Sequence, residues 1–424
     1  MDKSKILVDL GTVADISLKH DLENPVHIRI TATLDHEIND DLIRKAWDRT
    51  KRVYPVIDGV LGFEHGDESL FMDPKMKAQY SGDHVYIVQT DKGANAPIKT
   101  KVPVAPGTDT VGKRMICISY YEKKVSISAY HVLVDGSGLN KVFNTFIYSY
   151  LALYTGHEDE SPVVELREGR APEEYYTSDI NKLIYSMDYT PVPLYSLPPY
   201  CKGFDDRGLM FDGNYYSGSI DVPAADFIKL CKENGANPSA MLCTLMAKAA
   251  YAVNEGETND IVFCMTLSLK KILGLDDDIS NASSFAVTYA AHDELMNGSI
   301  ADVSKKIRKD VDMQRTKDYC ITYQRSTATY TYIPKFRPRM VTYLGNVNIG
   351  DNTNHIVDLE METDGHFVAY MIQLGERFII SLQYDNITEK YLEALKKTFT
   401  EWGIKSDISH PAAHVLKDSQ TAVL

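Results

Sequence analysis

His131 and Asp135 are the residues of this chain best placed to do chemistry; three residues separate them, and Gly136 follows Asp135 at once. His131 continues the alternating run 125–130, so it lies at the end of a predicted strand, where a firm element passes into a turn. A neutral imidazole there accepts a proton from a hydroxyl or an amine near pH 7. The plainer alternative is a core histidine beside an ordinary Asp-Gly turn, and these residues by themselves favour that alternative.

The segment 129–136, Ala-Tyr-His-Val-Leu-Val-Asp-Gly, resembles the HHxxxDG signature of a large acyltransferase superfamily. That superfamily includes chloramphenicol acetyltransferase, nonribosomal-peptide condensation domains, plant acyltransferases of the HxxxD type and alcohol acetyltransferases. Tyr130 stands at the first histidine of the condensation-domain form. His131 stands at the second histidine, the one that carries the chemistry.

The resemblance continues over roughly residues 25–403. A predicted strand at 25–35 leads into a helix that begins after the capping residue Asn39. Further on, 340–347 resembles the second-lobe strand that faces the histidine across the active-site tunnel. The strand and helix predicted over 378–402 resemble the closing elements of the family. From the order and spacing of these pieces, the chain is identified as a member of this superfamily.

The resemblance implies an α+β fold of two chloramphenicol-acetyltransferase-like αβ sandwich lobes, arranged as a pseudo-dimer with an active-site tunnel between them. It implies that His131 is the general base, that Asp135 braces the turn and that Gly136 permits it. The acceptor's hydroxyl or amine would lose its proton to His131 while it attacks a thioester. The candidates for the tunnel lining are Tyr130, Thr342, Tyr343 and Asn346.

One departure from the family pattern concerns the partner of Asp135. Condensation domains carry a Leu-Arg pair shortly after the first helix, and its arginine pairs with the motif aspartate. The corresponding stretch here, 54–59, has no arginine. Arg29, Arg52 or backbone donors are the remaining partners. The departure favours a free-standing enzyme of the alcohol acetyltransferase type over a condensation domain.

The implied function is therefore transfer of an acyl group from coenzyme A, or from the phosphopantetheine of an acyl carrier protein, to an alcohol or amine. Both donors are substrates, and no bound cofactor is expected. Two alternatives stay open: a catalytically silent member that binds a ligand or a carrier protein, and a nonribosomal-peptide condensation enzyme acting in trans. Retention of His131, Asp135 and Gly136 together favours catalysis.

The net charge of the chain and the distribution of its basic residues indicate which classes of partner it can bind. The formal net charge of −14 argues against nucleic acid, whose binding requires clustered Lys and Arg. A local basic cluster, Lys335, Arg337 and Arg339, precedes the 340–347 strand. Its composition favours a solvated loop, and the alternative is a contact with the phosphates of coenzyme A or of a carrier's arm. The three carboxylates at 276–278 likewise indicate a solvated loop and not a metal site.

At 424 residues the chain exceeds the size of one ordinary core, which predicts two domains. We expect an N-terminal lobe at 1–180 that carries the motif, a proline-punctuated crossover at 181–215 and a C-terminal lobe at 216–424 that faces the tunnel. The residues from Ser406 onwards lack periodicity and are predicted to be a loosely docked tail.

The expected environment is the cytoplasm. No apolar run reaches the 18 residues that suggest a membrane span, and the amino end lacks the pattern of a secretory signal. The six cysteines are scattered without Cys-x-x-Cys pairs, several of them within apolar runs, which indicates reduced, buried thiols. The expected partners are a small-molecule acyl donor and acceptor, and the expected state is a monomer.

Overall fold

The computed structural model describes residues 6–12, 27–64, 84–90, 95–108, 111–131, 133–158, 160–161, 163–178, 180–198, 201, 215–327, 339–363, 368–384 and 389–415. The chain divides into two compact units. The first contains Met1–Leu183, Leu273–Ala282 and Val347–Asp364, and the second contains Ile184–Ile272, Ser283–Asn346 and Gly365–Leu424. Two segments from the second half of the sequence therefore belong to the unit that carries His131.

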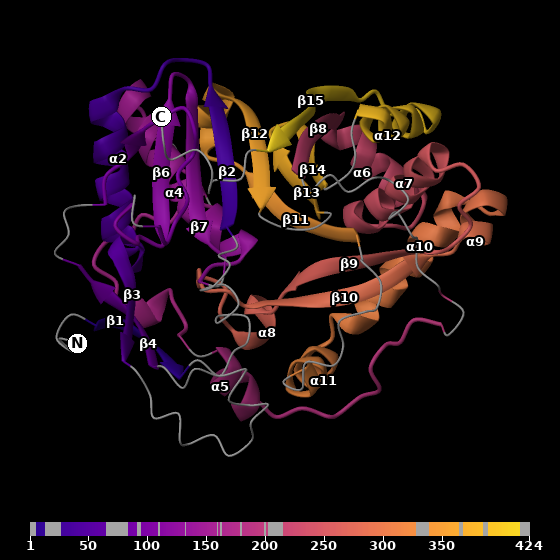
Figure 1. Cartoon of the computed structure of the whole chain (residues 1–424), viewed down its shortest axis with the longest axis horizontal. Helices are drawn as coiled ribbons and strands as arrows, with labels where there is room; N and C mark the ends of the chain where they lie inside the picture. Colours follow the sequence, from indigo (N-terminus) through magenta and orange to yellow (C-terminus); the bar gives the residue numbers. More distant parts are fainter. Residues whose placement is uncertain are drawn as a thin grey trace. The chain divides into compact units, whose positions relative to one another are not determined.

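A five-stranded sheet forms the centre of the first unit (Figure 1). Its strand order is β12-β2-β7-β6-β5, and its pairs are antiparallel except for β5 with β6. The strands are β2 (His27–Leu34), β5 (Ile98–Lys99), β6 (Ile116–Tyr121), β7 (Lys124–Tyr130) and β12 (Ile356–Thr363). A separate sheet of order β1-β4-β3 consists of β1 (Ile6–Thr12), β3 (Gly59–Glu64) and β4 (His84–Gln89).

The pairing of β2 with β7 gives this sheet one apolar face and one polar face. Apolar residues lie opposite each other on one face, for example Ile30 opposite Ile127. On the other face Arg29 Nε donates to Ser128 Oγ at 3.0 Å, and Thr31 Oγ1 lies 2.8 Å from Ser126 Oγ. Alternation along each strand thus directs the apolar side chains to one side, as the pleat requires.

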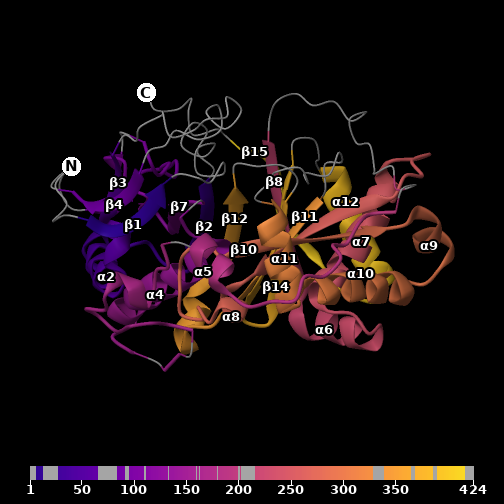
Figure 2. The same cartoon turned by 90° about the horizontal axis from the view of Figure 1, so that it is seen from below.

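Helices α2 (Asp40–Val53) and α4 (Gly136–Thr155) pack side by side on one face of the first unit's sheet (Figure 2). The Asn39 side chain caps α2 by accepting from the backbone N–H groups of Asp41 and Leu42, which confirms the predicted helix start. The Trp47 ring of α2 meets the Phe146 ring of α4 edge-on, with ring centroids 5.7 Å apart. This packing places the first turn of α4, and the motif before it, on a rigid support.

A seven-stranded sheet of order β10-β9-β11-β13-β14-β8-β15 forms the centre of the second unit. Its strands are β8 (Tyr215–Pro223), β9 (Ile261–Ser268), β10 (Ser283–Ala290), β11 (Arg339–Val347), β13 (Val368–Leu374), β14 (Arg377–Tyr384) and β15 (Asp407–Val415). Helix α7 (Pro238–Val253) contacts α6 (Ala224–Glu233), α10 (Ile300–Gln314) and α12 (Glu389–Glu401). The shorter elements are η2 (Pro55–Asp58), η5 (Pro172–Glu174), α5 (Ile180–Ser186), α8 (Lys270–Leu273), α9 (His292–Asn297), α11 (Lys317–Thr327) and η7 (Gly350–His355). The predicted α+β class with two αβ units is confirmed.

The prediction of a loosely docked tail is wrong for 407–415. This segment is the edge strand β15, antiparallel to β8. Its pairing is interrupted between Ile408 and His410 and again between His410 and Ala413. Because such irregularities break the period-two pattern, and Pro411 lies within the second of them, the sequence does not show the alternation of an ordinary strand.

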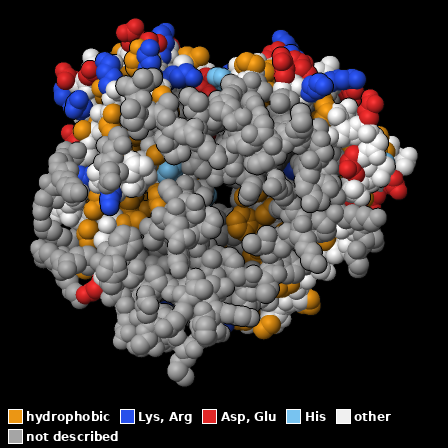
Figure 3. Space-filling model, viewed as in Figure 1, with side chains coloured by type: hydrophobic (Ala, Val, Ile, Leu, Met, Phe, Trp, Pro, Cys, Tyr) orange, Lys and Arg blue, Asp and Glu red, His pale blue; other side chains and the backbone are white. Residues whose placement is uncertain are grey.

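The surface carries charges of both signs. On the face in Figure 3, the acidic and basic side chains that are drawn are interspersed and not gathered by sign. Within the described residues, no helix is long and apolar enough to cross a membrane.

Candidate active site

The predicted motif forms the connection between β7 and α4. β7 ends at Tyr130, and the backbone N–H of Leu133 donates to the Tyr130 carbonyl at 3.1 Å, which closes a turn. Tyr130 itself is buried and donates its N–H to the carbonyl of Met115 at 2.9 Å. A short connection between a central strand and a buried helix therefore holds His131.

His131 is partly exposed, and one of its ring nitrogens has a backbone partner. Its Nδ1 lies 3.2 Å from the carbonyl oxygen of Val134. Because a carbonyl only accepts hydrogen bonds, this contact places the proton on Nδ1. In the neutral ring the lone pair is then on Nε2, the atom that a general base uses.

Asp135 is buried and serves as the N-cap of α4. Its Oδ1 accepts hydrogen bonds from the backbone N–H of Gly138 and from Ser137 Oγ, both at 2.7 Å. Its Oδ2 accepts from the backbone N–H of Ala282 at 3.2 Å. Backbone amides, one of the partners that the sequence left open, thus hold this carboxylate. Of the arginines considered, Arg29 pairs with Glu362 and Arg52 pairs with Glu168.

A segment far away in sequence supports the motif turn. Asn281 donates from Nδ2 to the His131 carbonyl at 3.0 Å and from its backbone N–H to the Leu133 carbonyl at 3.2 Å. The hydroxyl of Tyr176 also donates to the Leu133 carbonyl, at 3.1 Å. Sequence reasoning missed Asn281 and Tyr176. Neither stands in a local pattern, since Asn281 is separated from His131 by 150 positions.

The three carboxylates at 276–278 differ from one another. Asp276 and Asp277 are exposed, as predicted for a solvated loop, but Asp278 is buried, so the prediction is wrong for that residue. Asp278 Oδ1 accepts from the backbone N–H of Ser280 at 2.6 Å and also from its hydroxyl. Asp278 therefore shapes the loop that presents Asn281.

Close packing requires a glycine at position 138. A Cβ added at Gly138 would lie 2.0 Å from the carbonyl oxygen of Ile279, which is backbone and unable to rotate away. Gly136 is the first residue of α4 and is not among the described glycines with a positive φ. The small residue two positions after the motif thus lets 279–282 approach the turn.

Gly138→Ala is expected to destabilise the protein by about 1–3 kcal/mol, because an extra methyl group in a packed site forces backbone shifts. Ser137→Ala is the neighbouring control. It removes one hydroxyl from the same turn and adds no volume against Ile279. Urea unfolding of both variants checks this. A G138A protein as stable as the S137A protein would contradict the packing argument.

The remaining predicted site residues belong to the second unit or lie outside the described residues. Thr342, Tyr343 and Asn346 are on β11. Thr266 Oγ1 donates to Thr342 Oγ1 at 3.1 Å. Arg339 is buried at the start of β11, whereas Lys335 and Arg337 are not within the described residues. The contribution of these residues to a site with His131 stays a prediction.

The cysteines offer no alternative nucleophile. All six lie within the described ranges as buried free thiols. Burial raises the pKa of Cys117 and of Cys264 to about 12, and that of Cys320 to about 11. Since the thiolate is the reactive form, these groups are inert near neutral pH.

Comparison by sequence finds no matching family model and no matching curated protein. Comparison with solved structures finds likenesses over nearly the whole chain. Polyketide synthase associated protein 5 from Mycobacterium tuberculosis is 12% identical, with a TM-score of 0.56 over 93% of this chain and 97% of that one. F. sporotrichioides TRI101, complexed with coenzyme A and T-2, is 8% identical, with a TM-score of 0.58 over 96% and 99%.

The first condensation domain of the CDA synthetase is 10% identical, with a TM-score of 0.55 over 93% of this chain and 94% of that domain. At such identities the likeness concerns the fold, which extends through both units. The chain thus shares its fold with these three structures, one of which is a condensation domain, as its motif predicts.

Proposed function

We propose that this protein is an acyltransferase that moves an acyl group from a thioester to an alcohol or an amine. The observation that carries the proposal is the contact of His131 Nδ1 with the Val134 carbonyl, which leaves Nε2 as the proton acceptor. The fold likeness to TRI101, solved with coenzyme A, supports a coenzyme A thioester as the donor.

In the proposed reaction, His131 Nε2 takes the proton of the acceptor's O–H or N–H group while that atom attacks the thioester carbonyl. A tetrahedral intermediate forms with its negative charge on the former carbonyl oxygen. Collapse of the intermediate breaks the carbon–sulfur bond, and the imidazolium returns its proton to the departing thiolate. Base catalysis of this kind contributes about 10²–10⁴-fold to the rate.

Positioning and charge stabilisation would supply the rest of the acceleration. Because Thr342 Oγ1 accepts a hydrogen bond from the hydroxyl of Thr266, its own O–H can donate to the developing oxyanion. We assign Tyr130, Tyr343 and Asn346 to the lining of the proposed tunnel between the 1–180 and 216–424 lobes. The cluster Lys335, Arg337 and Arg339 would meet the phosphates of the donor.

Asp135 acts as a positioning residue in this scheme. Its carboxylate accepts three hydrogen bonds and so joins the first turn of α4 to the 279–282 segment. Asn281, on that segment, holds the His131 carbonyl. Gly136 completes the connection to α4. Together these contacts would keep the imidazole in one orientation during turnover.

The likeness to a condensation domain favours one second candidate, a condensation enzyme acting in trans on a carrier-bound thioester. The two candidates share His131 and differ in the donor. We place the protein in the cytoplasm, where both kinds of donor are made.

The test is release of free thiol from acetyl- and longer acyl-coenzyme A in the presence of a panel of alcohols and amines, with products identified by mass spectrometry. An acylated carrier protein serves as the second donor. Thiol release that depends on the acceptor supports acyl transfer, and release from the carrier alone assigns the trans-acting candidate. Binding of both donors without turnover of either would overturn the proposal in favour of a silent binding protein.

A further inference from the structure

A second cluster of titratable side chains lies at the opposite end of β2 from the motif. β2 ends at Leu34, which pairs with Ile356 at the start of β12. Asp35 and His36 therefore meet His355, and the Asp35 N–H donates to the His355 carbonyl at 3.1 Å. His27, at the other end of β2, pairs with Tyr130, so the cluster is about 23 Å from the motif at roughly 3.3 Å per residue.

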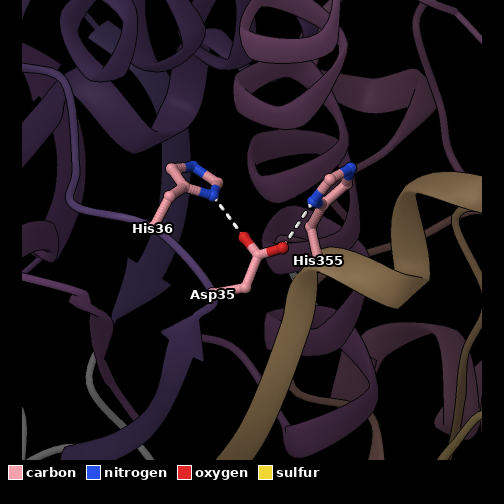
Figure 4. A group of neighbouring side chains, drawn as sticks. All are labelled: Asp35, His36 and His355. Atoms are coloured by element: carbon pink, nitrogen blue, oxygen red, sulfur yellow. Dashed lines mark hydrogen bonds and ion pairs between the residues drawn. The ribbon is translucent and has the colours of Figure 1, made fainter.

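The two histidine rings point toward the Asp35 carboxylate, one to each of its oxygens, as Figure 4 shows. His36 Nδ1 lies 2.5 Å from Asp35 Oδ1, and His355 Nδ1 lies 2.9 Å from Asp35 Oδ2. One ligand atom from each residue lies within 4.8 Å of the other two. Two imidazole nitrogens and a carboxylate oxygen are a ligand set typical of zinc.

The surroundings hold one imidazole firmly and leave the carboxylate open. The His36 ring stacks on Tyr154 with ring centroids 3.6 Å apart and planes 2° apart. Its Nε2 lies 3.4 Å from the hydroxyl of Tyr150, a suitable outer partner for a histidine that binds metal through Nδ1. The Asp35 side chain is 45% exposed, so water can reach the cluster.

We propose that Asp35, His36 and His355 bind a Zn²⁺ ion through one carboxylate oxygen and the two Nδ1 atoms, with water as the fourth ligand. Binding displaces the proton from each Nδ1, since the lone pair of that nitrogen then goes to the metal, and each neutral imidazole carries its one proton on Nε2 instead. Bonds of about 2.0–2.1 Å in a tetrahedral site separate ligand atoms by about 3.3 Å. The carboxylate must therefore turn slightly away from the rings. The ion would link the end of β2 to the start of β12.

The test is titration of the full-length protein, freed of metal by a chelator, with Zn²⁺ in a calorimeter and with Co²⁺ in a spectrometer. Wild-type protein is expected to bind Zn²⁺ and to show the visible absorption of four-coordinate Co²⁺. His355→Gln should weaken the affinity by more than about 10-fold and remove the Co²⁺ bands. Tyr150→Phe, which removes the outer partner of His36 together with the acceptor of the Asn39 N–H, should weaken it by about 10-fold.

His292→Gln is the matched control, because His292 Nδ1 lies 3.0 Å from Asp293 in a comparable neighbouring pair in the other unit. Its affinity should equal that of wild type. Circular dichroism of the metal-free variants establishes that each is folded. Absent wild-type binding, or equal affinity in wild type and H355Q, overturns the proposal. Acyl transfer does not enter this test, so its result is independent of the proposed function.

Discussion

Replacement of His131 by alanine is expected to lower kcat for acyl transfer by at least about 10²–10⁴-fold, the contribution of a positioned general base. The variant has no group to take the acceptor's proton, whereas the hydrogen bonds of Asp135 that build the turn do not involve the imidazole. The KM for the thioester should change much less than kcat. Steady-state kinetics with the donor identified by the thiol-release assay checks this.

His157→Ala is the control for H131A. His157 is an exposed histidine of the same unit and follows the carboxyl end of α4. Its loss should leave turnover unchanged. Full activity in H131A would show that the imidazole takes no part in the reaction. Loss of activity together with loss of the folded circular dichroism spectrum would mean that the ring is structural, which also contradicts the proposed role.

Asp135→Asn is expected to destabilise the protein by about 1–3 kcal/mol and to lower kcat. The carboxylate accepts from three donors, two of them buried backbone N–H groups. An amide keeps only one accepting oxygen, and its NH₂ group must then face Ala282 N–H or Gly138 N–H as a second donor. The turn that carries His131 would shift, so kcat should fall more than the affinity for the donor. Urea unfolding and steady-state kinetics measure the two effects.

Asp278→Asn offers a matched control, because Asp278 is buried to the same 4% exposure as Asp135. Its hydrogen bonds to Ser280 use a single oxygen, which an amide retains. The D278N protein should therefore lose less stability than the D135N protein. Equal stability of D135N and wild type, or a larger loss in D278N, would show that the three-donor arrangement does not hold the turn.

Local signals in the sequence were sufficient for most of the elements. Asn39 was predicted as a helix cap, and its side chain accepts from the backbone N–H groups of Asp41 and Leu42. Gly235, which follows α6, has a φ of +64°, in the left-handed region that favours glycine. Such signals act within a few residues, so they are readable without the fold. The motif was recognisable for a similar reason, since its residues lie within one turn.

Only the tertiary structure decided what surrounds those residues. Asp135 has its distant partner at Ala282, and His131 is held by Asn281, because a loop from the second half of the chain packs into the first unit. Asp35 meets His355 across 320 positions through the pairing of β2 with β12. Contacts of this kind depend on which surfaces meet after the chain folds and leave no periodic pattern along the sequence. The sequence by itself therefore determined the elements and the reactive motif, whereas long-range packing decided how the motif is held and where a second cluster forms.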